Sequence, residues 1–198
     1  MAKTITKKFV PDPRPLFRIE GNAYCKILNY VKLCEREISW HGFVTRGQDD
    51  NAHIFTLHDV ILFPQTVNFT YCKLTGEYYT WYKKNISIDQ EFEEQCKLFG
   101  HSHITGDVSP SDCDKQYYAN IVRDFVEYGD EYYIFMIMNR AEKMDLQIFD
   151  YKTMVKYYTE DIDCRIVKSI RNPAPSPIKD IRKEIEKNVS VGVYRYSG

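Results

Sequence analysis

Apolar residues follow two different spacings along this chain, and the two spacings separate predicted helices from predicted strands. After Gly21, apolar side chains return every three or four residues, which is the period of a helix with one buried face. The same period returns in the middle of the chain and near its end. It predicts helices over residues 21–35, 88–96, 109–125 and 178–187.

Shorter runs of β-branched and aromatic residues predict strands between these helices. The runs cover residues 37–44, 54–63, 67–72, 97–103, 131–139, 145–151 and 164–168. Turn-forming residues at 47–51 and 140–143 join two pairs of runs and predict two hairpins. Because strands and helices are mixed throughout, we expect an α/β or α+β fold with a mixed sheet flanked by helices.

The two ends of the chain differ in composition from its middle. Residues 1–20 combine lysine, arginine and proline and predict an extended basic arm. A proline-rich stretch at 173–177 predicts a linker, so that residues 171–198 hold this linker, a helix and a tail. A chain of 198 residues suits one packed core, and we place that domain at residues 21–170.

The charge balance and the lack of long apolar runs argue against several classes of partner. With 27 basic and 28 acidic residues, the chain lacks the positive field on which non-specific nucleic-acid binding depends. No run approaches the roughly 20 apolar residues of a membrane span, and the N-terminus does not resemble a signal peptide. We therefore expect a cytoplasmic protein that binds neither nucleic acid nor membrane. Its six cysteines form no CxxC pair and are expected to be reduced and mostly buried.

Aromatic residues make up 15% of the chain, and one group of them has two possible roles. Tyr78, Tyr79, Trp81 and Tyr82 either line a groove for an extended peptide or pack into the core. Core packing is the commoner role of aromatic side chains, so we nominate none of the four as a site residue.

The segment from Gly100 to Asp114 carries the residues most suited to bind a metal ion. In a strand, side chains two positions apart share a face, so His101 and His103 point the same way. A turn follows, and Ser111 and Asp114 lie three residues apart on one face of the next predicted helix. Two imidazole nitrogens and one carboxylate suit Zn²⁺ and leave its fourth position open, as in catalytic zinc sites.

Other candidate ligands fit less well. Cys113 adjoins Asp114 and therefore points about 100° away around the helix. His41, His53 and His58 lie on a predicted hairpin without ligand spacing, as surface or core histidines do. A histidine pair on a strand is itself weak evidence, because most such histidines bind no metal. The specificity comes from the spacing of the whole segment.

That spacing resembles a known motif. Two histidines separated by one residue, then seven residues, a serine, two residues and an aspartate resemble the JAMM motif of the JAB/MPN metallopeptidase family. Here the motif positions are held by His101, His103, Ser111 and Asp114. The resemblance extends over about residues 24–151. One departure is Ile104, which stands where many members carry a proline and which affects the loop rather than the ligands.

Members of this family also carry a glutamate at the start of the first strand after a helix. Glu37 matches that position, and Glu37-Ile-Ser-Trp-His-Gly resembles the E-x-x-W-x-G form of bacterial and phage members. Glu35 is the alternative, but it falls within the predicted helix end. The resemblance implies an MPN/JAB-like, cytidine-deaminase-like fold, in which helices flank a curved mixed sheet.

The resemblance also implies roles for the candidate residues. His101, His103 and Asp114 would hold Zn²⁺, and Glu37 would be the general base for the attacking water. Ser111 would hydrogen-bond this water or the developing oxyanion, although it is equally suited to begin the helix. The implied activity is that of a deubiquitinase-like isopeptidase or peptidase. It would hydrolyse an amide bond after the extended C-terminal tail of a ubiquitin-like, phage or bacterial protein.

Two other functions are compatible with parts of this pattern. A catalytically silent MPN-type scaffold would show broken ligand positions, whereas all five positions here hold competent residues. A RadC-like relative associated with DNA repair has a similar loop between the ligands, but the neutral charge argues against direct contact with DNA.

Overall fold

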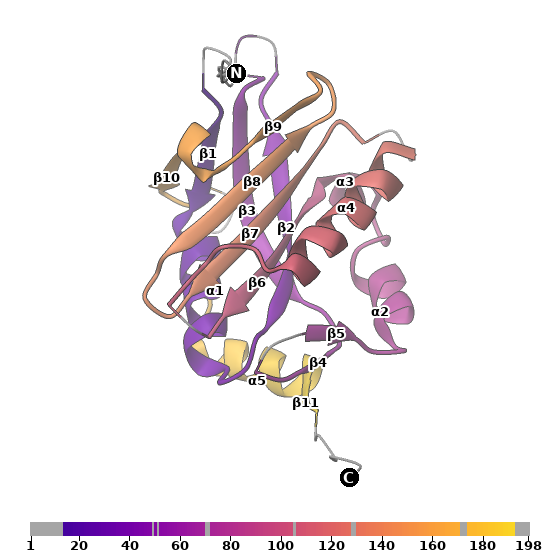
Figure 1. The fold of residues 1–198 in the computed structure, drawn as a ribbon. Coiled ribbons are helices and arrows are strands. Elements are labelled where there is room, and N and C mark those ends of the chain that lie inside the picture. Colours follow the sequence, from indigo (N-terminus) through magenta and orange to yellow (C-terminus); the bar gives the residue numbers. More distant parts are fainter. Residues whose placement is uncertain are drawn as a thin grey trace, which may run out of the picture.

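The computed structural model describes residues 14–48, 50, 52–69, 72–104, 106–127, 130–170 and 174–192, with 124–127 described by their backbone alone. Within these ranges the chain forms a curled eight-stranded mixed sheet, a second sheet of three strands and five α-helices (Figure 1). The expected mixture of a curved mixed sheet and flanking helices is therefore confirmed at this level of detail.

The large sheet brings strands from distant parts of the chain side by side. Its order is β10-β1-β3-β2-β6-β7-β8-β9. The strands are β1 (Leu16–Glu20), β2 (Ser39–Arg46), β3 (Ile54–Leu62), β6 (Cys96–His103), β7 (Tyr132–Asn139), β8 (Met144–Asp150), β9 (Val155–Tyr157) and β10 (Asp163–Val167). β1 runs parallel to β3 and β10, β6 runs parallel to β7, and the other neighbours are antiparallel. β2 and β6 are thus central strands with neighbours on both sides.

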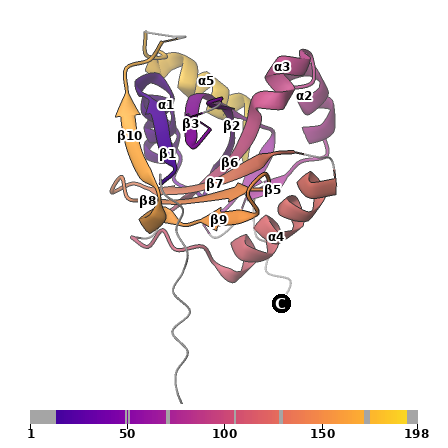
Figure 2. The same ribbon diagram turned by 90° about the horizontal axis from the view of Figure 1, so that it is seen from above.

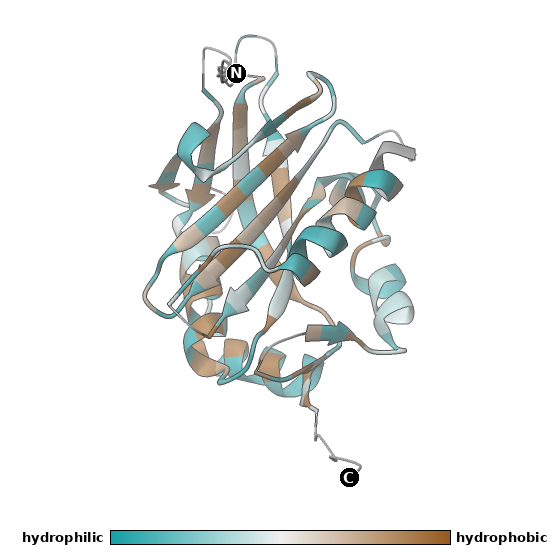
Figure 3. Ribbon diagram, in the orientation of Figure 1, coloured by the Kyte–Doolittle hydropathy of each residue, from teal (hydrophilic) through white to brown (hydrophobic). Residues whose placement is uncertain are grey.

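Helices pack on the large sheet and form two hydrophobic clusters with it. α1 (Gly21–Leu33) and α5 (Ile178–Asn188) lie next to each other and bury Tyr30 and Ile181 in the larger cluster (Figure 2). The remaining helices are α2 (Tyr78–Asn85), α3 (Gln90–Gln95) and α4 (Asp112–Glu127). α2 and α4 bury Trp81 and Tyr118 in the second cluster. The hydropathy pattern follows this arrangement, because apolar residues recur along the strands of the large sheet, which hold much of the buried core (Figure 3).

The small sheet lies beside one end of β2 and β3. Its strands are β4 (Gln65–Val67), β5 (Cys72–Leu74) and β11 (Val189–Val191), in the order β11-β4-β5. Pro64 follows the end of β3 at Leu62, as expected for a residue without a backbone N–H. The chain then turns into β4 and β5, so the single extended segment predicted over 67–72 is wrong.

Elements from both ends of the chain pack with residues 21–170, the range predicted for the domain. Leu16–Glu20, expected at the end of a basic arm, form β1 between β3 and β10. α5 packs against α1, and β11, expected in a tail, pairs with β4. Composition does not reveal this, because strand pairing and burial depend on distant residues. The rest of the expected arm and tail, residues 1–13 and 193–198, lies outside the described residues.

Several local expectations also change. All six cysteines are free, as expected, but Cys25, Cys113 and Cys164 are exposed rather than buried. α1 ends at Leu33 rather than near Glu35, and the short strand β9 was not expected. Among the described residues, no helix combines the length and the apolar character needed to cross a membrane.

Candidate metal centre

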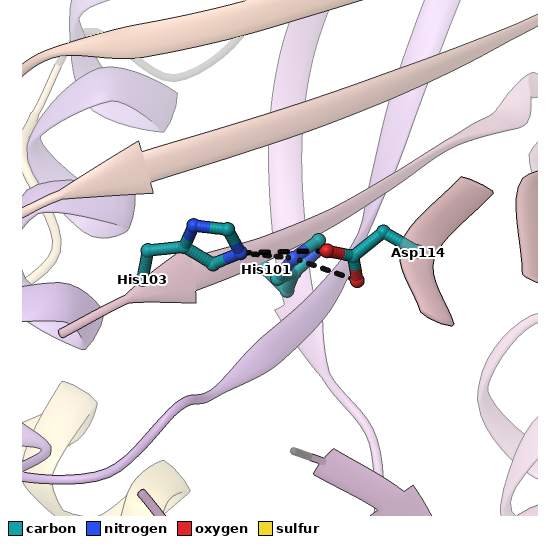
Figure 4. A group of neighbouring side chains, drawn as sticks. All are labelled: His101, His103 and Asp114. Carbon is teal, nitrogen blue, oxygen red and sulfur yellow. Dashed lines mark hydrogen bonds and ion pairs between the residues drawn. The ribbon is translucent and has the colours of Figure 1, made fainter. Parts of the chain in front are cut away.

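The two histidines of the predicted motif lie on one face at the end of strand β6. They alternate with Ser102 along the strand, so both imidazoles extend toward the first turn of α4. Asp114 approaches from that turn and completes a group of three (Figure 4). The side chains of His101, His103 and Asp114 are 7%, 12% and 21% exposed, so they are largely shielded from solvent.

The spacing of the three side chains fits a small tetrahedral ion. The Nε2 atoms of His101 and His103 lie 3.2 Å apart. Asp114 Oδ1 lies 3.2 Å from Nε2 of His101, and Asp114 Oδ2 lies 3.5 Å from Nε2 of His103. Ligands about 2.0–2.1 Å from a tetrahedral zinc ion are about 3.3–3.4 Å from one another. The two Nε2 atoms have about this separation, and each lies within 3.5 Å of one Asp114 oxygen, so the three residues have the chemistry of a zinc ligand set and could hold the ion after small adjustments.

Hydrogen bonding sets the orientation of one of the two rings. Nδ1 of His103 lies 3.1 Å from the backbone carbonyl oxygen of Asp107, which can only accept a hydrogen bond. This contact places a proton on Nδ1, so that Nε2, the atom that faces Asp114, is the ring nitrogen that could bind a cation once the ring is neutral. Second-sphere contacts of this kind are typical of histidines that bind metals.

The charges within the group perturb one another. Hydrogen bonding to Asp114 is the main cause of a raised pKa for His103. Burial by itself would raise the pKa of Asp114, but hydrogen bonds from His101 and His103 outweigh burial and hold that pKa well below its usual range. The carboxylate is therefore ionised at neutral pH, which is the state that binds a cation.

Ser111 and Asp114 form a reciprocal cap at the start of α4. The backbone N–H and the hydroxyl of Ser111 both donate to Oδ2 of Asp114, at 2.8 and 2.6 Å. The backbone N–H of Asp114 donates to the Ser111 hydroxyl oxygen at 3.2 Å. This is the geometry of a capping box, and α4 begins at Asp112 rather than at Ser109 as expected. The capping role of Ser111 is therefore observed, and it also orients the aspartate.

Glu37 reaches the same cavity from the segment before β2. β2 and β6 are antiparallel with Ser39 opposite His101, so continuing this register by two residues places Glu37 opposite His103. Burial is the main cause of a raised pKa for Glu37, to about 7, which His103 lowers and Asp114 raises. Glu35 is exposed and does not line the cavity. Glu35 lies beyond the end of α1 at Leu33, so the expectation that it falls within the helix end is wrong.

Two residues that the sequence did not single out fix the backbone around Glu37. Ser102 accepts a hydrogen bond from the Ile38 N–H at 3.0 Å and donates its own N–H to the Ile38 carbonyl at 2.8 Å. The fully buried Gln65 side chain accepts from the Ser39 N–H and donates to the Ser39 carbonyl oxygen. The position of Gln65 directly after Pro64 was the sequence feature that could have indicated this role. Because β3 ends at Leu62, it no longer pairs with the start of β2, and another polar group must hydrogen-bond the backbone there.

The site opens into a cavity of about 650 Å³, which lies within the size range of ligand pockets. The cavity is lined by Glu37, Ser39, Phe63, Phe69, Cys72, Lys73, Leu74, Phe99, His101, His103, Ser111, Cys113, Asp114 and Tyr117. All five residues predicted for the site are among them. Cys113 lines the wall without belonging to the ligand group.

The remaining candidates lie elsewhere. His41 is buried among aromatic rings, where its Nε2 contacts the Tyr78 hydroxyl at 2.8 Å. His58 hydrogen-bonds Glu20 and is not part of the ligand group. Trp81 is buried and Tyr79 is exposed, and neither lines the cavity. For Trp81, core packing is therefore the correct interpretation.

No protein-family model matches this chain, and no curated protein matches its sequence.

Proposed function

We propose that this protein is a zinc-dependent peptidase or isopeptidase of the JAB/MPN type, with a JAMM-type centre on an MPN/JAB-like fold. The observation that carries the proposal is the convergence of His101, His103 and Asp114 into one possible ligand group, with Glu37 in the same cavity.

In this proposal His101, His103 and Asp114 hold the ion, and Glu37 transfers a proton from the attacking water to the leaving amine. A bound zinc ion would supply Lewis acidity, which polarises an amide carbonyl and lowers the pKa of water to about 7. Glu37 is partly buried in the same cavity, with a pKa raised to about 7, so it exchanges protons readily at neutral pH. Its carboxylate accepts the proton of the attacking water, and the resulting carboxyl group delivers that proton to the leaving amine.

Ser111 has two consecutive tasks in the same proposal. Its hydroxyl orients Asp114 in the free protein. With substrate present, the same hydroxyl is near enough to the ligand group to donate to the developing oxyanion. The substrate is a protein with an extended C-terminal tail, of ubiquitin-like or other origin, and this part of the proposal rests on the motif resemblance.

Elemental analysis combined with proteomics tests the proposal. The wild-type protein should bind about one zinc ion per chain, and His101→Ala should lose the zinc. Glu37→Gln should keep the zinc and lose hydrolysis, whereas Glu35→Gln, the matched control on the same segment, should retain both. Cleavage is measured by mass spectrometry of new termini in a cell lysate. Zinc binding without any cleavage that depends on Glu37 would favour a silent scaffold, and absence of zinc would overturn the centre itself.

A further inference from the structure

A row of aromatic side chains continues the cavity away from the ligand group. Phe99 lies two residues before His101 on β6 and therefore on the same face, with the two ring centroids 6.1 Å apart. Its ring contacts Tyr117 of α4 edge to face at 4.9 Å and stacks with Phe63 at 6.2 Å. All three rings line the cavity. Its wall therefore changes from polar at His101 to aromatic at Phe99, two residues earlier on the same face of β6.

The opposite side of this region is also apolar. Leu74, on the edge strand β5, is 38% exposed, and Phe69, which precedes that strand, is 60% exposed. Tyr117 is also 38% exposed. These exposed fractions are high for large apolar side chains, and all three residues line the same cavity. Phe63 and Phe99 themselves are buried, so the exposed apolar surface of this part of the cavity belongs to Tyr117, Leu74 and Phe69.

We propose that this region, formed by Phe63, Phe99, Tyr117, Leu74 and Phe69, is a specificity pocket for an apolar side chain next to the scissile amide. The inference rests on the proposed function and defines the substrate of the same site. Two residues along β6 correspond to about 6.6 Å. In a bound substrate, the tip of a large side chain lies at about the same distance from the neighbouring carbonyl carbon. A substrate whose carbonyl lies at the ligand group can therefore place such a side chain against the Phe99 and Tyr117 rings.

The charge distribution supports an apolar occupant. The acidic groups of the cavity, Glu37 and Asp114, lie at the ligand end, Lys73 on β5 lines the wall, and the guanidinium of Arg36 lies 3.5 Å from the centroid of the Phe69 ring. A charged side chain placed against Phe99 and Tyr117 would lose solvation, and neither ring offers it an ion-pair partner. An aromatic or branched aliphatic side chain would instead exchange water contact for contact with the exposed apolar surfaces of Tyr117, Leu74 and Phe69.

Simple hydroxamates test the pocket, because the hydroxamate group chelates zinc while its neighbouring substituent probes the wall. The probes are the hydroxamates of N-acetylphenylalanine, N-acetylalanine and N-acetylaspartate. Their dissociation constants are measured by calorimetry on the zinc-loaded full chain, with the metal-free chain as a blank. We expect the phenylalanine probe to bind about tenfold more tightly than the alanine probe, and the aspartate probe to bind most weakly.

Variants then assign the preference to the pocket. Tyr117→Ala should reduce the tenfold ratio to about threefold or less, whereas Tyr117→Phe should retain it. Tyr79→Ala is the matched control, because Tyr79 is an exposed tyrosine on α2 that does not line the cavity. Leu74→Ser provides a second variant at the opposite wall, remote in sequence from the ligands. Zinc content is measured for every variant, so that a change in selectivity is separated from loss of the ion.

The outcomes distinguish the pocket from the metal centre. Equal affinities of the three probes for the wild-type protein would overturn the pocket and leave the proposed function intact. A preference that survives both Tyr117→Ala and Leu74→Ser would likewise overturn it. Failure of every probe to bind the zinc-loaded chain better than the metal-free chain would overturn the centre and the pocket together.

Discussion

The hydroxyl oxygen of Ser102 accepts a hydrogen bond from the backbone N–H of Ile38. Ser102 stands between the two histidines of the candidate ligand group, and Ile38 directly follows Glu37. One buried side chain thus links the strand that carries the histidines to the segment that carries the expected base. Because Ile38 directly follows Glu37, the Ser102 hydrogen bond helps to fix the position of the Glu37 backbone.

Replacing Ser102 with alanine should separate the position of Glu37 from metal binding. The change leaves the buried N–H of Ile38 without this partner and should cost about 1–3 kcal/mol of unfolding free energy. Zinc content should stay unchanged, and any peptidase activity should fall because Glu37 is less firmly placed. Chemical denaturation and elemental analysis measure both effects. Ser102→Thr, which keeps the hydroxyl, is the control, and loss of zinc in Ser102→Ala would contradict this assignment.

Ser111 should show its capping role in stability and its proposed catalytic role in rate. Ser111→Ala removes the hydroxyl from the capping box and should destabilise the protein by about 1 kcal/mol. Ser111→Gly, which also lacks a side-chain donor but is a better N-cap than alanine, should recover most of that stability. If Ser111 only caps, activity should recover together with stability in the glycine variant, whereas an oxyanion contact predicts that activity stays low in a rate assay.

The raised pKa of Glu37 predicts a definite pH dependence in the metal-free protein. The folded state holds the Glu37 proton up to about pH 7, whereas the unfolded state releases it near the ordinary value of 4.5. This group therefore favours folding below pH 4.5, and that contribution is lost as the pH rises toward 7. Relative to Glu37→Gln, the wild-type protein should lose stability between those pH values. Urea unfolding of both proteins across this range measures the difference, and a constant difference would contradict the prediction.

Gly100 should tolerate no side chain. A Cβ atom at this position would lie 2.2 Å from Nε1 of Trp40, its partner across β2 and β6. Trp40 is fully buried and cannot move aside without displacing the core. Gly100→Ala should therefore cost about 1–3 kcal/mol or more through overpacking. Thermal unfolding measures the loss, and combining the change with Trp40→Leu should recover part of it because the smaller side chain leaves space.

Glu184 should show that the C-terminal helix belongs to the domain. Its carboxylate accepts hydrogen bonds from the Tyr30 hydroxyl at 2.7 Å and from the Leu62 N–H at 2.9 Å. Glu184→Ala leaves both donors without this partner and should cost about 1–3 kcal/mol for each. The exposed Lys183 of the same helix gives the control substitution, Lys183→Ala, which should be nearly neutral. Equal stability of the two variants would mean that α5 contributes little.

The local features of the site were predictable from the sequence. Strand alternation places His101 and His103 on one face, and helical spacing places Ser111 and Asp114 together. These relationships depend only on the geometry of neighbouring residues, so they hold wherever the segment lies in the fold. The structure moves the helix start to Asp112 but leaves the spacing intact.

The placement of Glu37 beside this segment followed from a resemblance, and only the tertiary structure supplies its physical basis. The register of β2 against β6, the Ser102 bridge and the Gln65 side chain bring it there. The sequence likewise did not indicate that β1, α5 and β11 pack with the rest of the fold, or that an aromatic row lies beside His101. The sequence by itself determined which residues have the chemistry and the local spacing of a zinc site. Which distant residues surround them was decided by strand pairing and burial, because those contacts join segments whose separation along the chain carries no periodic signal.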